Sequence, residues 1–262
     1  MKVLFVGDIV GRAGRRALTT FLRKVRSSHE VAFIVANGEN SAGGFGITPA
    51  VAEDLFDFGI DVITSGNHIW DKKEAIPYLP KENRLLRPLN YPPDSPGAGS
   101  VIMKARDGVR VAVVNIEGRV FMRPQDCPFR AIDRELQALK AETPVVIVDF
   151  HAEATSEKLA MGWHLDGRVS AVLGTHTHVQ TADERILPGG TAYITDVGMT
   201  GPSESVIGVK KDIILRRFLT SMPERFETAK EFPQFQAVIV DIDPDSGTAR
   251  KIERLNLVDQ PE

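Results

Sequence analysis

Two histidines stand one residue apart, at positions 176 and 178, in the segment GTHTHVQ. The chain contains only six histidines, so this pair is a notable concentration of them. In an extended segment alternate residues face the same side, so His176 and His178 would point into one pocket while Thr177 faces away. Imidazoles placed together in this way are typical of a metal site.

Polar residues also follow several other apolar, β-branched segments at the point where each segment ends. Segments of this kind are typical of buried strands followed by loops. With the two histidines included, the polar residues at these ends are Asp8, Glu39, Asn40, Asn67, His68, His151, His176 and His178. Because ligands of open α/β sheets bind at the carboxyl ends of the strands, we expect all eight around one crevice.

Most of these residues have an ordinary structural explanation when each is considered alone. Asp8 could be a helix cap or turn residue, the asparagines could occupy turns, and His151 could be a hydrogen-bonded core histidine. Glu39 is harder to explain, because a carboxylate that closes a buried apolar segment needs a partner. Structural roles alone would have to coincide at five strand ends, so the set as a whole favours metal binding.

The donor types indicate which metals such a site would bind. Imidazole, carboxylate and amide donors without thiolate suit manganese, iron or zinc, and they argue against a structural zinc site of the cysteine type. Seven ligands are too many for one tetrahedral ion but suit two ions that share a bridging carboxylate. The single cysteine, Cys127, is interpreted as a small, partly buried residue and cannot form an internal disulfide.

The segments that would position these residues alternate with helical patterns. Strands are predicted at 2–8, 31–40, 61–68, 109–118, 144–153 and 169–178. Helices are predicted at 13–26, 49–58, 129–142 and 155–163. This alternation is typical of βαβ units in a largely parallel sheet with helices packed outside.

Local signals refine this pattern. Thr48 is the expected N-cap of the helix that begins with Pro49. Asp71 and Glu74 suggest a capping box on a further helix. Beyond residue 180, glycine-containing turns predict one hairpin at 186–196 and another at 236–257, which indicate a second sheet. The apolar segment 212–222 is predicted to be an amphipathic helix that could pack on its own core or on a partner. A homo-oligomer is therefore possible.

Composition limits the class of protein. With 262 residues, 42% hydrophobic and 26% charged, the chain is expected to form a single globular domain over residues 1–262. A net charge of −3 provides no basic surface for long nucleic acid. The apolar segments are far shorter than the ~20 residues of a membrane span or the ~7–15 of a signal-peptide core, so no membrane partner and a cytoplasmic location are expected.

The strand-end motifs together resemble the calcineurin-like metallophosphoesterases. The matching segments are GD at 7–8, GEN at 38–40, GNH at 66–68, FHAE at 150–153 and GTHTH at 174–178. Two departures from the common pattern, Val10 in place of a histidine and Glu39–Asn40 in place of a bridging aspartate, resemble the bacterial YmdB-like branch. The resemblance implies a single metallophosphoesterase domain, an α/β fold built as an αββα sandwich of two mixed β-sheets flanked by helices.

The resemblance also implies a ligand set and an activity. One ion would be bound by Asp8, Glu39, Asn40 and His178, and the other by Glu39, Asn67, His151 and His176. The cofactors would be two iron or manganese ions, with zinc as an alternative, and the substrate would be a small phosphodiester such as a 2′,3′-cyclic nucleotide. A hydroxide formed between the ions would attack phosphorus, and His68 would protonate the leaving oxygen.

Several alternatives remain open at the level of sequence. The same metal site could serve a phosphomonoesterase or a small-RNA nuclease, and a non-catalytic regulator could use it to bind a phosphorylated ligand. Phe45, in the glycine-rich segment 42–48, could stack on a base or be a buried loop residue. Asp71 could orient His68 or cap a helix.

Overall fold

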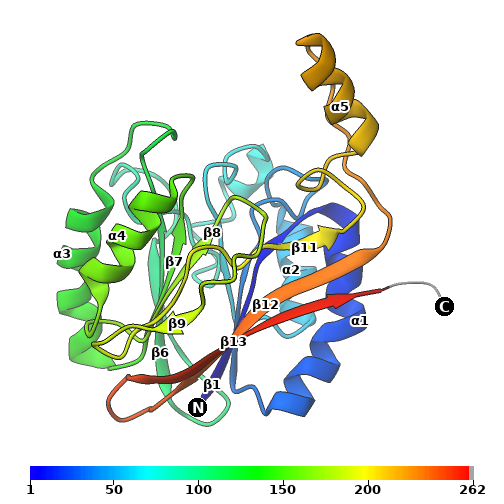
Figure 1. The fold of residues 1–262 in the computed structure, drawn as a ribbon. Helices are drawn as coiled ribbons and strands as arrows, with labels where there is room; N and C mark the ends of the chain where they lie inside the picture. The colour runs from blue at the N-terminus through cyan, green and yellow to red at the C-terminus, as the bar shows by residue number, and fades with distance from the viewer. Residues whose placement is uncertain (260–262) are drawn as a thin grey trace.

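Two β-sheets packed face to face form the centre of the molecule in the computed structural model, which describes residues 1–259 (Figure 1). The first sheet has the strand order β2-β11-β12-β1-β3-β4, with β13 paired to β12. Its strands are β1 (Lys2–Val6), β2 (Asp8–Ile9), β3 (Phe33–Asn37), β4 (Val62–Thr64), β11 (Met199–Pro202), β12 (Pro233–Ile242) and β13 (Ala249–Val258). The pairs β1–β3 and β3–β4 are parallel, whereas β12 is antiparallel to β1, β11 and β13.

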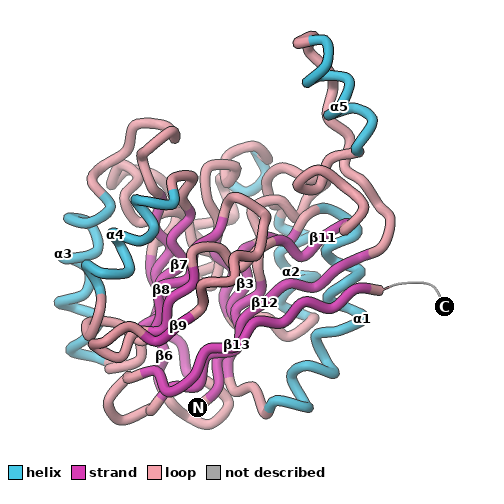
Figure 2. The backbone as a smooth tube through the Cα atoms, in the orientation of Figure 1, coloured by secondary structure: helices cyan, strands magenta, loops and turns pink. Residues whose placement is uncertain are grey.

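The second sheet has the order β5-β6-β7-β8-β10-β9. Its strands are β5 (Ser100–Lys104), β6 (Arg110–Glu117), β7 (Val146–His151), β8 (Ala171–Thr175), β9 (Arg185–Ile186) and β10 (Ala192–Ile194). The four strands β6, β7, β8 and β10 are parallel, and antiparallel strands lie at both edges. Both sheets are therefore mixed. Figure 2 shows their strands in magenta, with the helices in cyan.

Helices cover the outer faces of the two sheets. They are α1 (Gly11–His29), α2 (Pro49–Asp57), α3 (Pro128–Glu142), α4 (Thr155–Leu165) and α5 (Lys211–Thr220), with a short 3₁₀ helix η1 (Lys73–Ala75). The pair α1 and α2 packs on the first sheet and the pair α3 and α4 on the second, while α5 projects from the body (Figure 1). Within the described residues, none of these helices has the length and apolarity needed to cross a membrane.

Alternate residues of each strand face opposite sides of the sheet, and this alternation explains the layers of the fold. Val3 and Phe5 of β1 enter the core between the two sheets, whereas Leu4 and Val6 enter the core beneath α1 and α2. A third core lies between the second sheet and α3 and α4. Because the central strands are apolar on both faces, they need cover on both sides, and the αββα sandwich provides it.

The sandwich expected from the family resemblance is confirmed, and so are the six predicted strands and the four predicted helices. The expectation of one largely parallel sheet was wrong, because the first three predicted strands lie in the first sheet and the next three in the second. The two predicted hairpins exist as β9–β10 and β12–β13, but each extends a sheet that earlier strands had begun. The last three residues of the domain predicted over 1–262 lie outside the described residues.

The two cap predictions had different outcomes. The side chain of Thr48 accepts a hydrogen bond from the backbone N–H of Val51, as expected of the α2 N-cap. The capping box was wrong, because η1 is a single 3₁₀ turn that begins after Lys72 without a side-chain cap. Asp71 instead accepts a hydrogen bond from Nδ1 of His68 at 2.8 Å. The carboxylate of Asp71 therefore binds the ring of His68 and does not cap a helix.

A buried ion pair fixes the chain just after β8. Nζ of Lys158 lies 2.6 Å from Oδ2 of Asp196, and both side chains are buried. Lys158 also donates to the carbonyl of Thr175, at 2.7 Å. The same Asp196 oxygen accepts from the backbone N–H and the hydroxyl of Thr177, at 3.1 and 2.8 Å. The pair thus ties α4 and the segment after β10 to the turn that carries the two closely spaced histidines.

Loss of one partner from this pair should be costly. Asp196→Ala leaves the Lys158 ammonium buried without its carboxylate, and the expected loss is about 3–5 kcal/mol in the free energy of unfolding, measured by urea denaturation. The control is Glu253→Ala, which breaks the exposed pair with Lys251 and should cost at most about 1 kcal/mol. Equal, small losses in the two variants would show that the buried pair does not stabilise the turn.

Candidate metal centre

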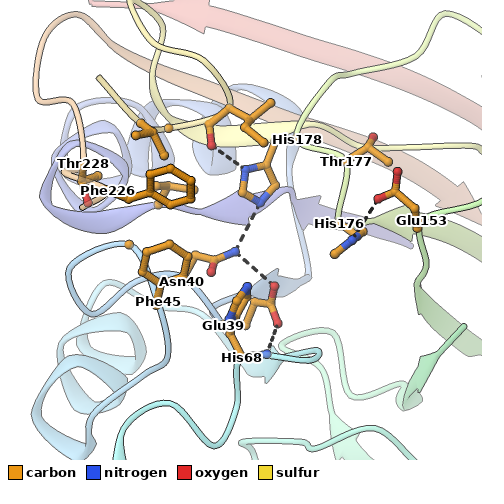
Figure 3. Close-up of a pocket in the computed structure, with 15 residues that line it drawn as sticks. Glu39, Asn40, Phe45, His68, Glu153, His176, Thr177, His178, Phe226 and Thr228 are labelled. Atoms are coloured by element: carbon orange, nitrogen blue, oxygen red, sulfur yellow. Dashed lines mark hydrogen bonds and ion pairs between the residues drawn. The ribbon is translucent and has the colours of Figure 1, made fainter. Parts of the chain in front are cut away.

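A pocket of about 280 Å³ opens at the carboxyl ends of the strands, where loops from both sheets meet. Five of the eight residues singled out by sequence line it, namely Glu39, Asn40, His68, His176 and His178 (Figure 3). The other three lie behind the pocket lining: Asp8 and His151 contact His176, and Asn67 contacts His151. The structure therefore brings the whole predicted set together.

One group of donors surrounds the carboxylate of Asp8. Nε2 of His178 lies 3.7 Å from Oδ1 of Asp8 and 3.2 Å from the amide nitrogen of Asn40. The same Asn40 nitrogen lies 3.1 Å from Oε1 of Glu39. These contacts join the four residues that the family resemblance assigned to one ion.

A second group surrounds Nε2 of His151. This atom lies 3.2 Å from Oε1 of Glu39, 3.1 Å from Oδ1 of Asn67 and 3.0 Å from Nδ1 of His176. The ligand atoms of Glu39, His151 and His176 all lie within 4.8 Å of one another. Oε1 of Glu39 is thus in contact with both groups, which is the position required of a shared carboxylate.

Three histidines in these groups have their outward ring nitrogens held by other groups. Nδ1 of His151 contacts the Thr175 hydroxyl at 2.9 Å, and that hydroxyl donates to buried Asp149 at 2.6 Å. Nδ1 of His178 contacts the carbonyl oxygen of Ile207 at 2.9 Å.

In the third, His176, Nε2 lies 3.0 Å from Oε2 of Glu153. An acceptor on the outer nitrogen fixes the tautomer and ring orientation of a metal-binding histidine and leaves the inner nitrogen free for the ion. This arrangement holds for all three rings.

The electrostatics of the site call for a cation. Asp8 and Glu39 are almost completely buried, and burial alone would raise the pKa of each. Contacts with His178 and His151 outweigh burial and lower both pKa values. Burial alone would lower the pKa of His151, but the charges of Glu39 and Asp8 raise it to about 10. An imidazolium thus supplies the positive charge that the two carboxylates require.

The pKa of His176 shifts in the opposite direction from that of His151. Burial and the neighbouring positive charge of His151 lower the pKa of His176 to about 3. His176 is therefore neutral at pH 7, with its proton on Nε2 facing Glu153. Its Nδ1 lone pair faces the interior of the site, as binding to a metal requires.

One oxygen of Asp8 has no hydrogen-bond partner among the protein groups. Oδ1 is buried and has no hydrogen-bond partner, while Oδ2 accepts from the backbone N–H of His176 at 3.2 Å. A buried, unpartnered carboxylate oxygen is costly unless a cation or donor satisfies it. Carboxylate, amide and imidazole donors are also the set that iron, manganese and zinc accept. The residues present fit a pair of divalent ions.

The reason given from sequence for the convergence of His176 and His178 was wrong. The segment is not extended, because β8 ends at Thr175 and both histidines have positive φ, 101° and 65°. Left-handed backbone costs a residue other than glycine of order 1–3 kcal/mol and persists only when the surroundings impose it. The hydrogen bonds from Thr177 to Asp196 provide that restraint. A turn, not strand alternation, directs both rings inward.

His68 differs from the other pocket histidines. Its Nδ1 donates to Asp71, its backbone N–H donates to Oε2 of Glu39 at 3.1 Å, and its ring stands edge-on to that of Phe45, with centroids 5.1 Å apart. Phe45 is 37% exposed and lines the pocket, so it is not a buried loop residue. His68 therefore lies beside the two donor groups, at the surface where a ligand would bind.

Sequence reasoning missed several residues that take part in this site. Glu153 follows His151 by two positions within the quoted FHAE motif, and Asp149 interrupts an otherwise apolar strand; both were signals that could have been used. The segments on either side of α5 supply Ile207 and Phe226 to the pocket wall, and no local pattern indicates this.

Comparisons with known proteins agree with this geometry. The model of a family described as YmdB-like protein matches residues 4–255. A Bacillus subtilis protein named 2′,3′-cyclic-nucleotide 2′-phosphodiesterase is 47% identical over 99% of this chain and 98% of its own.

Two crystal structures are also similar to the whole fold. A hypothetical protein from Thermus thermophilus is 42% identical, with a TM-score of 0.93 over 99% of this chain and 100% of that one. A phosphatase from Mycoplasma pneumoniae is 35% identical, with a TM-score of 0.92 over 98% and 93%. By its sequence, its fold and the residues gathered at its pocket, the chain belongs to the YmdB-like protein family.

Proposed function

We propose that this chain is a metal-dependent phosphodiesterase that hydrolyses 2′,3′-cyclic nucleotides. The observation that carries the proposal is the orientation of the three histidines: one ring nitrogen of each is held from outside, and the other lies in a donor group that contains buried Asp8 or Glu39. The name of the Bacillus subtilis relative supports the substrate class, since the identity extends over nearly the whole of both chains.

The donor groups suggest how two cations would be held. Asp8, Asn40 and His178 would bind one, Asn67, His151 and His176 the other, and Glu39 both. When bound, the ions would supply positive charge for the phosphate oxygens and acidify a water molecule. Manganese or iron is the proposed pair, and zinc is the alternative that such donors also accept.

His68 is the proposed general acid. Its Nδ1–H is held by Asp71, so Nε2 is the nitrogen left to carry a proton to the departing oxygen. Asp71 also orients the ring, because the carboxylate lies only 2.8 Å from Nδ1. The backbone bond from His68 to Glu39 fixes this acid relative to the donor groups.

Substitution of His68 tests the catalytic assignment. His68→Ala should lower kcat for 2′,3′-cyclic AMP by about 10²–10⁴-fold, because protonation of the leaving oxygen is lost. Metal content, measured by elemental analysis, should not change. Chelation of the metal should abolish turnover in both proteins, and added manganese or iron should restore each protein to its own earlier rate.

The matched control is His29→Ala, at the end of α1 and outside the pocket lining, which should keep full activity. Full activity of His68→Ala would overturn the role of this residue. Faster turnover of phosphomonoesters or oligonucleotides than of the cyclic diester would replace the proposed substrate class. Tight binding of cyclic nucleotide by metal-loaded protein without any product would favour a regulator.

Glu153 offers a second test, because its proposed role is to orient His176. Glu153→Ala removes the acceptor of the His176 Nε2–H, and the expected result is metal binding weakened about 10–100-fold. Glu153→Gln keeps an acceptor oxygen and should weaken binding less. The measurement is retained metal after dialysis against graded chelator, with exposed Glu142→Ala on α3 as the control. Unchanged retention in Glu153→Ala would refute the role.

A further inference from the structure

The pocket has one apolar side that the metal-site proposal leaves unexplained. Val10, Phe45, Ile207, Val209 and Phe226 line it. Figure 3 shows the two phenylalanine rings at one end of the pocket and the His176–Glu153 pair at the other. A ligand that fills the pocket therefore meets charged groups at one end and aromatic rings at the other.

The ring of Phe226 is fixed in place although it belongs to a loop after α5. The guanidinium of Arg217, from α5, lies 4.9 Å from the ring centroid. This cation–π contact stabilises the ring while it lines the pocket. Arg217 thereby links the projecting helix α5 to the pocket wall.

The loop of Phe226 is also attached to the glycine-rich loop of Phe45. The hydroxyl of Thr228 donates to the carbonyl of Gly43 at 2.9 Å. A Cβ on Gly44 would lie 2.5 Å from the same hydroxyl oxygen, so only glycine permits this approach. The two phenylalanines thus come from loops that are tied together beside the donor groups.

We propose that Phe226, together with Phe45, forms a stacking surface for the nucleobase of the substrate and accepts all four bases. This inference rests on the proposed phosphodiesterase function and identifies how the nucleoside would be recognised. A nucleobase attached to a phosphate has a flat π-face at one end, which suits the aromatic rings, and negative charge at the other, which the cations of the proposed function would attract.

The composition of the apolar side explains the tolerance for different bases. Stacking on an aromatic ring does not depend on the hydrogen-bonding edge of the base. The residues that define the apolar side have no donors or acceptors in their side chains, and the hydroxyl proton of neighbouring Thr228 is already donated to Gly43. Strong discrimination needs donors and acceptors that an incorrect base leaves unpaired. This surface would therefore bind a nucleobase without distinguishing which of the four bases it is.

The test compares metal-loaded wild type and Phe226→Ala on 2′,3′-cyclic AMP and on methyl riboside 2′,3′-cyclic phosphate, which lacks a base. Stacking contributes about 1–3 kcal/mol per base, so KM for the nucleotide should rise about 5–150-fold, with kcat nearly unchanged. The base-free substrate should be hydrolysed equally well by both proteins. Phe45 is left intact because its ring touches His68.

Two further variants separate stacking from a structural role. Phe226→Trp keeps a π-face and should retain the wild-type KM. Phe218→Ala removes a phenylalanine on α5 that is 79% exposed and outside the pocket lining, and it should change neither substrate. Wild-type kcat/KM for the adenosine, guanosine, cytidine and uridine cyclic phosphates should agree within about tenfold.

Specific results would overturn the stacking surface. One is an equal loss of kcat/KM on both substrates in Phe226→Ala, and another is wild-type turnover of the base-free diester as efficient as that of the nucleotide. A strong preference for one base would refute the tolerance. Failure of metal-loaded wild type to hydrolyse either cyclic phosphate would instead refute the proposed function, so the two failures are distinguishable.

Discussion

Two carboxylates, Asp8 and Glu39, are buried where the sheets meet, and each negative charge there needs a positive partner. His151 provides one by holding a proton, with its pKa raised to about 10. A divalent cation would satisfy the carboxylates better, because it would also fill the unpartnered coordination of Asp8 Oδ1. The surrounding architecture can be understood as the structure needed to keep these charges close together and away from water.

The sandwich makes this possible by directing two sheets toward one opening. Asp8 and Glu39 come from the first sheet and its loops, whereas His151 and the turn after β8 come from the second. Buried side chains cross between the sheets, since Asn37 and Thr64 both donate to Asp149, at 3.0 and 2.5 Å. Polar contacts behind the site therefore set the relative position of the layers that supply the donors.

Much of this arrangement could be predicted from sequence, because it depends on local patterns. Buried strands ending in polar residues indicated the eight residues that the structure brings together at the pocket, and Thr48 marked the start of α2. Local patterns could not predict which strands belong to which sheet, because the apolar segments are alike in both sheets. The turn geometry of His176 depends on Asp196, twenty residues later, and the wall residue Phe226 on a helix that projects from the body. Long-range contacts decide these features.

The position of β12 has a consequence for how the molecule is made. This late strand lies between β11 and β1, and the carbonyl of Gln236 accepts the backbone N–H of Gly7, next to Asp8. During translation, both edges of β1 can therefore be paired only after residues 233–242 have been synthesised. The site that contains Asp8 is therefore completed only after these residues have emerged from the ribosome.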